Sequence, residues 1–235
     1  MAEQEESLIH HLEALRTALI KSFVALGIGL VPMFLAAPFF IGGLIKIIVG
    51  GNKIELNYFS PMEVFVLQIK TAVVLDLLVC SPYIARQIWK FLLPALYENE
   101  RRFVKSTVFA SSCLFIVGVL FCIFFILPLI INFGLSFATA DIKAMFGISN
   151  IVGLALTLSV IFGLMFQFPL VTYSLIRSGL ASYQGVKSKR PYVFVGILVA
   201  AGILTPPDIV SQLMLAVPTY LLFEAGLSAA KKYSL

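Results

Sequence analysis

Carboxylates beside basic residues are the first candidates for binding chemistry in this chain. Glu98 and Glu100 directly precede Arg101 and Arg102, and Glu13 lies near the N-terminus. A carboxylate accepts the planar guanidinium group of arginine through two parallel hydrogen bonds, so such a cluster could hold an arginine-bearing peptide. A solvated loop that makes its own weak ion pairs is the simpler interpretation of the same residues. Both interpretations stay open from the residues alone.

A catalytic centre or a metal site is not predicted. The two histidines, His10 and His11, are neighbours in the sequence and therefore do not share a helix face. The chain contains no H-E-x-x-H metal motif and no phosphate-binding glycine loop. The cysteines Cys80, Cys113 and Cys122 fall inside apolar runs, which is typical of small buried or lipid-facing residues. We therefore expect no enzyme, no metal and no cofactor.

Three polar residues, Lys70, Asp76 and Gln167, fall inside long apolar runs. A lone carboxylate at such a position should face the interior of a helix bundle or a wet cavity. Lys70 lies about 120° from Asp76 around a helix, so we expect its ammonium to extend outward rather than to pair with the carboxylate. The three residues define an alternative function, a small secondary transporter with an intramembrane polar site. The inverted repeats typical of transporters are absent from the sequence, which disfavours this alternative.

Composition identifies the elements that must position these residues. Hydrophobic residues make up 60% of the 235 residues, charged residues make up 12%, and the mean hydropathy is +1.01. A soluble domain has about 25% charged residues. We therefore expect an all-α integral membrane protein in contact with the lipid bilayer, with one domain over residues 1–235. The formal charge of +5 then reports which loops stay in the cytoplasm, and we expect no nucleic-acid partner.

The apolar runs predict six transmembrane helices, of which the last two are short. Their expected ranges are 18–48, 61–88, 108–131, 151–176, 192–204 and 209–223. The run 192–204 would rise only about 20 Å as a helix, against a hydrocarbon core of roughly 30 Å. It meets the last run at Thr205-Pro206-Pro207-Asp208, where the prolines enforce a turn. This hairpin must bend, recruit neighbours or lie in a thinned bilayer.

The distribution of basic residues predicts the orientation in the membrane. Thirteen of the 17 lysines and arginines fall on one set of loops and termini: Arg16, Lys21, Arg86, Lys90, Arg101, Arg102, Lys105, Arg177, Lys187, Lys189, Arg190, Lys231 and Lys232. Cytoplasmic segments carry such an excess of positive charge. We therefore expect both termini, and the segments 86–105 and 182–190, to be cytoplasmic.

Several separated motifs occur in a fixed order along nearly the whole chain. They are His11-Leu12 with Leu15-Arg16, Ser60-Pro61, the set Phe91, Pro94, Leu96, Tyr97, Glu100 and Arg101, then Phe166-Gln167-Phe168-Pro169, Lys189-Arg190-Pro191-Tyr192, Thr205-Pro206-Pro207-Asp208, Ser211-Gln212, Pro218 and Phe223-Glu224. Together they resemble TatC, the multi-spanning subunit family of the twin-arginine protein translocase. The chain departs from the family pattern at Ala14, where the acid falls one place early at Glu13, and at Gln167, which replaces a glutamate. Asp76 has no counterpart in the pattern.

The resemblance implies a fold, a function and partners. The fold would be a concave, glove-like bundle in the cytoplasmic (inner) membrane of a prokaryote. The protein would be the receptor that binds twin-arginine signal peptides of folded precursors at the cytoplasmic face. It would assemble with single-span TatA and TatB subunits and with other copies of itself, and export would be driven by the proton-motive force.

The resemblance also implies two sets of site residues. The signal-peptide surface would comprise Leu12, Glu13, Arg16, Phe91, Pro94, Leu96, Tyr97, Glu98, Glu100 and Arg101, with Glu100 as the arginine partner. The docking point for partner helices would comprise Thr205, Asp208 and Gln212. The residues themselves agree with the second set, because their polar groups lie where a bilayer makes unpaired polar groups costly.

Overall fold

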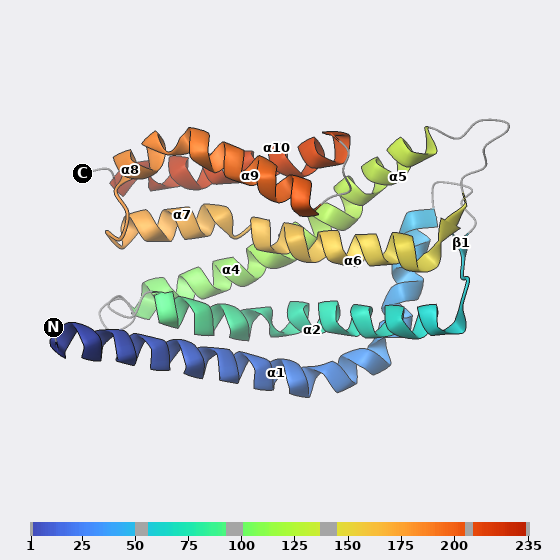
Figure 1. Cartoon of the computed structure of the whole chain (residues 1–235), viewed down its shortest axis with the longest axis horizontal. Helices are drawn as coiled ribbons and strands as arrows, with labels where there is room; N and C mark the ends of the chain where they lie inside the picture. The colour runs from blue at the N-terminus through green and yellow to red at the C-terminus, as the bar shows by residue number, and fades with distance from the viewer. Residues whose placement is uncertain (1, 50–55, 93–100, 137–144, 205–208, 234–235) are drawn as a thin grey trace.

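A computed structural model describes residues 2–49, 56–92, 101–136, 145–204 and 209–233. The helices run side by side along one long axis, and α1 begins at the end of the bundle where α10 finishes (Figure 1). Their bounds are α1 Ala2–Val49, α2 Pro61–Leu92, α4 Arg101–Phe121, α5 Leu127–Leu135, α6 Ile148–Met165, α7 Phe168–Arg177, α8 Tyr183–Ser188, α9 Arg190–Leu204 and α10 Ile209–Ala230. A π-helical segment, η1, covers Cys122–Ile126 between α4 and α5, and a 3-10 turn, η2, covers Lys231–Tyr233.

Five helical stretches are long and apolar enough to cross a membrane: Leu12–Val49, Pro61–Phe91, Phe103–Leu135, Ile148–Arg177 and Gln212–Ala230. A shorter apolar helix, Arg190–Leu204, lies between the last two. The prediction of a multi-pass helical membrane protein is therefore confirmed. The count of six spans remains a prediction, because α9 rises only about 22 Å.

The expectation that both helices of the last pair are short was wrong for the second. α10 has 22 residues and continues past Glu224 to Ala230, a rise of about 33 Å. The helix continues through Glu224, whose carboxylate has two hydrogen-bond partners. Arg190 Nη2 donates to one oxygen at 2.6 Å, and the Tyr220 hydroxyl donates to the other at 3.1 Å.

The largest apolar core joins η1, α6, α9 and α10, and it includes Phe162, Leu158 and Leu215. Beside it, a glycine permits direct backbone contact between α7 and α10. A Cβ at Gly226 would lie 2.4 Å from the Cα of Pro169 and 2.6 Å from its carbonyl oxygen. Backbone atoms cannot move aside as a flexible side chain can, and small residues are what allow membrane helices to approach this closely. The hairpin α9–α10 is thus held against the rest of the bundle through α7.

Pro38, inside α1, leaves one carbonyl oxygen without its usual partner, and a side chain of α2 replaces that partner. Pro38 has no N–H to donate to the Phe34 carbonyl, and proline is the usual cause of a sharp helix bend. α1 changes direction in its second half (Figure 1). Gln68 Nε2 of α2 donates to the Phe34 oxygen at 3.1 Å. The polar side chain therefore compensates for the bend and ties α2 to α1.

The hydrogen bond from Gln68 to the Phe34 carbonyl predicts that the stability lost on replacing Gln68 depends on Pro38. Gln68→Leu should lower the free energy of unfolding by about 1 kcal/mol, since hydrogen bonds between membrane helices contribute roughly 0.6 to 1.7 kcal/mol. In a Pro38→Ala background the helix regains the N–H for the Phe34 carbonyl, so Gln68→Leu should cost less. Denaturation of the purified protein in detergent micelles measures both differences. Equal losses in the two backgrounds would show that Gln68 does not compensate for the proline.

The end of the bundle opposite the termini is fastened by one carboxylate and a short strand pair. Glu63 accepts hydrogen bonds from the backbone N–H of Phe59 at 2.9 Å and from that of Ser149, in the first turn of α6, at 3.2 Å. β1 (Leu56–Asn57) pairs in parallel with β2 (Phe146–Gly147). These two strands are the exception to the all-α expectation.

Candidate functional site

The basic residues that the sequence groups together lie mainly at one end of the bundle. This end contains the end of α2, the start of α4, the end of α7, α8 and η2, and the first part of α1 extends from it (Figure 1). We call this the basic end. The acidic segment containing Glu98 and Glu100 connects α2 to α4 at the same end.

The five predicted site residues in this connection lie outside the described residues, namely Pro94, Leu96, Tyr97, Glu98 and Glu100. The two helix ends that flank them are described, and both belong to one apolar cluster. Trp89 of α2 is 3% exposed, and Phe103 and Val104 of α4 are 8% and 2% exposed. Packing into one cluster holds the end of α2 and the start of α4 together. Phe91 is half-buried on the last turn of α2, and the side chain of Arg101 lies outside the described side chains.

Arg177 adds a positive charge beside this cluster, and sequence reasoning assigned it no role. Its guanidinium carbon lies 3.9 Å above the centre of the Phe103 ring, and its Nη1 donates to the Tyr173 hydroxyl at 3.1 Å. A cation over an aromatic face is attracted by the negative face of the ring. Arg177, at the end of α7, therefore helps to fix the start of α4. Only the tertiary contact distinguishes it from the other basic residues at this end.

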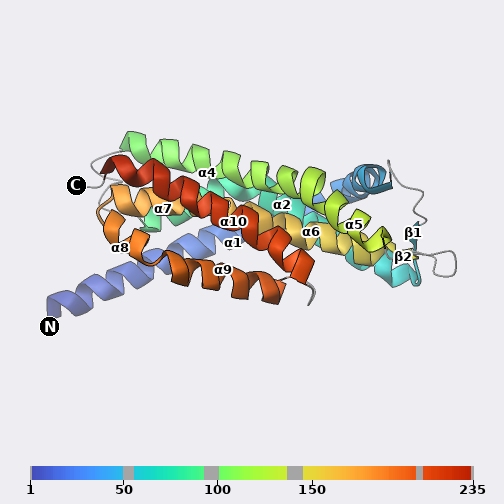
Figure 2. The same ribbon diagram turned by 90° about the horizontal axis from the view of Figure 1, so that it is seen from above.

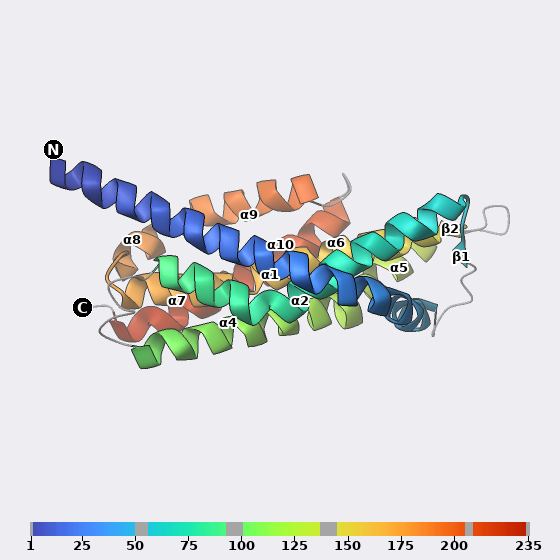
Figure 3. The ribbon, with the colours of Figure 1, turned by 90° about the horizontal axis from the view of Figure 1, so that it is seen from below.

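The predicted residues of α1 are exposed on an isolated stretch of helix. Leu12 is 57% exposed, and Glu13 and Arg16 are also exposed. The first part of α1 projects away from the other helices when the bundle is seen from above and from below (Figures 2 and 3). Glu13 and Arg16 are three residues apart and so share one face of this projecting helix. A peptide at the basic end could reach that face.

Gln167 lies where one long span breaks into α6 and α7, and it binds a third helix. Its Nε2 donates to the Ser111 carbonyl of α4 at 3.1 Å, and its Oε1 accepts from the Ser111 hydroxyl at 2.6 Å. A cavity of about 360 Å³ opens beside this pair, lined otherwise mostly by apolar residues that include Trp89 and Phe115. The amide thus meets its hydrogen-bonding needs without the charge that a glutamate would bring.

Asp76 faces the bundle interior, as predicted. Its side chain is 2% exposed and packs on Gly29 of α1, where an added Cβ would collide with the Asp76 Oδ1 atom. The Cys80 thiol donates to the same oxygen at 3.4 Å.

The three intramembrane polar residues do not form one site. Lys70 is exposed, whereas Asp76 is buried against α1 and Gln167 is bonded to α4. Within the described part of the chain no ion pair joins Lys70 to Asp76. The common polar site that the transporter alternative requires is therefore not assembled.

Gln212, near the start of α10, joins α10 to α9. Its Nε2 donates to the Leu198 carbonyl of α9 at 2.9 Å and lies close to Gly202. This bond uses one N–H, so the amide retains a second N–H and acceptor capacity on Oε1. Thr205 and Asp208 lie outside the described residues.

Arg190, at the start of α9, and Glu224, near the end of α10, form an ion pair. This pair closes the α9–α10 hairpin on the side of the basic end. Their side chains are 36% and 26% exposed, and the N–O distance is 2.6 Å. The sequence shows both residues within ordered motifs, but 34 positions separate them. Sequence reasoning therefore missed the ion pair.

Comparison with known proteins gives one consistent result. The family model described as "TatC: Sec-independent protein translocase protein (TatC)" matches residues 10–218. Similar proteins include the Sec-independent protein translocase protein TatC of Carboxydothermus hydrogenoformans, 31% identical over 232 residues, which cover 98% of this chain and 95% of that one. The TatC protein of Escherichia coli (strain K12) is 32% identical over 240 residues, covering 98% of this chain and 90% of that one.

The fold agrees with a solved structure as well. A crystal structure of the twin-arginine translocase receptor TatC in DDM matches with a TM-score of 0.86 and 32% sequence identity. The match covers 94% of this chain and 99% of the crystallised one.

Proposed function

The chain belongs to the TatC family of Sec-independent protein translocase proteins, and on this premise we propose that it is the signal-peptide receptor and core subunit of a twin-arginine translocase. As a family member it is a multi-pass membrane protein and a transport component of a bacterial translocase rather than a catalytic enzyme. The proposed receptor binds twin-arginine signal peptides of folded precursors at the cytoplasmic face. It assembles with TatA-type and TatB-type single-span subunits and with other copies of itself. Export is driven by the proton-motive force.

The single observation that carries the receptor proposal is the packing of the two helix ends that flank the acidic segment. Both flanking helix ends pack into the cluster of Trp89, Phe103 and Val104, and Arg177 covers Phe103. We infer that Glu100 and its neighbours, in the segment between these two ends, contact the arginines of the signal peptide. The projecting face of α1 with Glu13 and Arg16 supplies a second contact surface at the same end.

The proposed partner site lies at the outer end of the α9–α10 hairpin. α9 is too short for a full hydrocarbon core, and in this proposal the bilayer thins next to it. Gln212 keeps hydrogen-bonding capacity there after its bond to the Leu198 carbonyl. A polar group on a partner's transmembrane helix could use that capacity. Such bonds are weak enough for reversible docking, at about 0.6 to 2 kcal/mol.

The proposed location is the cytoplasmic membrane, with the basic end and both termini inside. Single cysteines placed by Arg101→Cys and Lys187→Cys, after replacement of the natural cysteines by alanine, should react with an impermeant thiol reagent from the cytoplasmic side. Lys53→Cys and Lys143→Cys should react from the outside, because positive charge is retained in the cytoplasm. Accessibility is measured on intact cells and on inverted vesicles. Labelling at position 143 from the cytoplasmic side alone would contradict the topology.

Binding to a twin-arginine peptide tests the function itself. The purified protein should retain such a peptide on affinity beads and should bring down single-span amphipathic subunits from detergent-solubilised membranes. A control peptide with both arginines replaced by glutamine should not be retained. Retention of both peptides to the same extent would contradict the receptor proposal. Uptake of a small solute by vesicles containing this protein alone would instead favour a transporter.

A further inference from the structure

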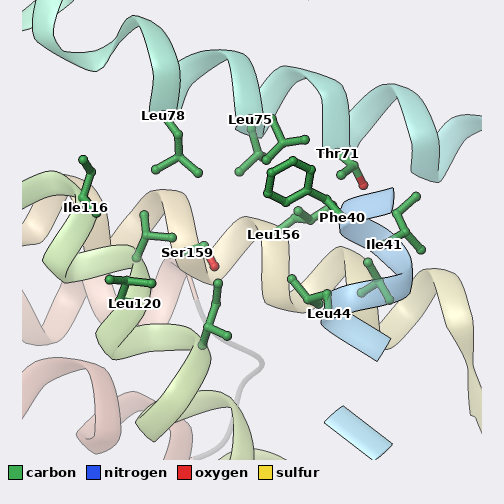
Figure 4. Close-up of a pocket in the computed structure, with 14 residues that line it drawn as sticks. Phe40, Ile41, Leu44, Thr71, Leu75, Leu78, Ile116, Leu120, Leu156 and Ser159 are labelled. Atoms are coloured by element: carbon green, nitrogen blue, oxygen red, sulfur yellow. The ribbon is translucent and has the colours of Figure 1, made fainter. Parts of the chain in front are cut away.

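An apolar cavity of about 190 Å³ lies among α1, α2, α4, η1 and α6, away from Gln167 and the basic end (Figure 4). Phe40, Ile41 and Leu44 form its wall on α1. Leu75 of α2, Leu120 of α4 and Leu156 of α6 face them across the space. None of these residues belongs to the proposed signal-peptide surface or to the hairpin site.

The cavity offers water almost nothing to bind. Its two hydroxyl groups are already bonded to their own helices: Thr71 Oγ1 donates to the Leu67 carbonyl at 2.8 Å, and Ser159 Oγ donates to the Ala155 carbonyl at 2.7 Å. The rest of the lining is aliphatic or aromatic. An apolar cavity of roughly 150 Å³ with such walls stays dry and takes up small hydrocarbons. The chemistry of the walls therefore selects a hydrocarbon ligand.

The backbone holds this space open. α1 bends near Pro38, so Phe40 and Leu44 lie on a segment that crosses toward α4 and α6 rather than continuing along α2 (Figures 1 and 4). On the opposite side Ile123 belongs to the π-helical segment Cys122–Ile126, a local distortion that often accompanies binding sites. The proline bend and the π-helical turn thus set the backbone spacing around the cavity.

The cavity also opens toward the lipid. Phe40, Ile116 and Leu120 are 49%, 43% and 46% exposed, and they fall within candidate membrane spans. Exposed apolar surface in such a span faces the hydrocarbon core of the bilayer. Acyl chains are present there at very high local concentration. A whole helix, about 10 Å in diameter, is too wide for a space of this size.

We propose that this cavity is a binding site for one acyl chain of a bilayer phospholipid. The chain enters between Phe40 and Leu120 and occupies the space that the bend of α1 leaves against α2 and α6. The bound lipid then packs the outer half of α1 onto the bundle.

Photo-crosslinking tests the site directly. The full chain is reconstituted into vesicles of phosphatidylethanolamine in which a fraction of the lipid carries a diazirine midway along one acyl chain. After irradiation, mass spectrometry should find crosslinks at Leu75, Leu120 and Leu156 about tenfold more often than at Val199 and Leu221, the ratio that a preference of 1.4 kcal/mol gives. Val199 and Leu221 are comparison positions because they are 56% and 62% exposed, on α9 and α10.

Filling the cavity should abolish the enrichment. Ser159→Leu and Val74→Phe both add apolar volume to the lining. Val199→Phe adds volume at an exposed site and serves as the matched control. Enrichment should disappear in both filled variants and persist in the control. Uniform labelling of the unmodified chain would overturn the proposal, whether or not the variants fold. Loss of the lipid crosslinks when a single-span subunit is added would also overturn the proposal, because it would assign the cavity to a side chain of that partner.

Discussion

Glu100→Gln should weaken binding of a twin-arginine signal peptide by about tenfold or more, because a charge-assisted hydrogen-bonded contact contributes roughly 1.5 to 3 kcal/mol. Glutamine keeps the shape of the side chain, but it removes the negative charge and replaces one acceptor oxygen by an N–H donor. The affinity of a fluorescent signal peptide for the purified protein measures the loss. Glu98→Gln is the matched control, two residues away on the same connection, and it should lose less affinity.

The peptide itself provides a second control for Glu100. Lysine cannot make the bidentate contact that arginine makes with a carboxylate. With both arginines replaced by lysine, the peptide should bind more weakly to the unmodified protein, and Glu100→Gln should then cost less. If the variant loses the same factor with both peptides, Glu100 supports the conformation of the connection instead of contacting arginine.

Gln212→Leu should slow or abolish export while leaving membrane insertion and signal-peptide binding intact. The substitution removes the amide proposed to dock partner helices, and with it the bond to the Leu198 carbonyl. Crosslinks from a partner's transmembrane helix to the outer end of the hairpin should weaken in parallel. Export of a folded precursor out of the cytoplasm is the readout. Leu213→Ala is the control, since it changes a neighbouring exposed side chain of α10 that is apolar.

A second variant tests the effect of the length of α9 on export separately from the effect of Gln212. Four leucines inserted before Thr205 would lengthen α9 from 15 residues to a helix that rises about 28 Å, close to a full hydrocarbon core. This should relieve the thinning of the bilayer and impair export even with Gln212 present. Export at the unmodified rate by both variants would place the partner site elsewhere. A drop in melting temperature for Gln212→Leu, with partner crosslinks unchanged, would show that the amide only stabilises the hairpin.

The helix expected from the run ending at residue 223 shows where local reasoning fails. The predicted apolar run ends where the chain reaches Glu224. In the structure Arg190 and Tyr220 bind it, and α10 continues to Ala230. The pair is formed by residues 34 positions apart. No window of sequence around Glu224 contains that information.

The membrane class, the long apolar helices and the short α9 followed from the sequence alone. This is possible because a bilayer requires each spanning segment to satisfy its own backbone hydrogen bonds, so length and hydropathy are read locally. The order of the motifs, from His11 to Glu224, likewise identified the family without any structure. The interior position of Asp76 followed from the cost of exposing a carboxylate to lipid.

Only the tertiary structure decided which polar groups meet. Gln68 bonds to the Phe34 carbonyl, Gln167 bonds to Ser111, and Asp76 packs on Gly29. Each contact depends on which faces of two helices pack together, and hydropathy does not specify this because lipid and protein interior are equally apolar. For the same reason the cavity under the bend of α1 could not be anticipated: Pro38 predicts a bend, but only the packing of α2, α4 and α6 against the bent segment encloses a space.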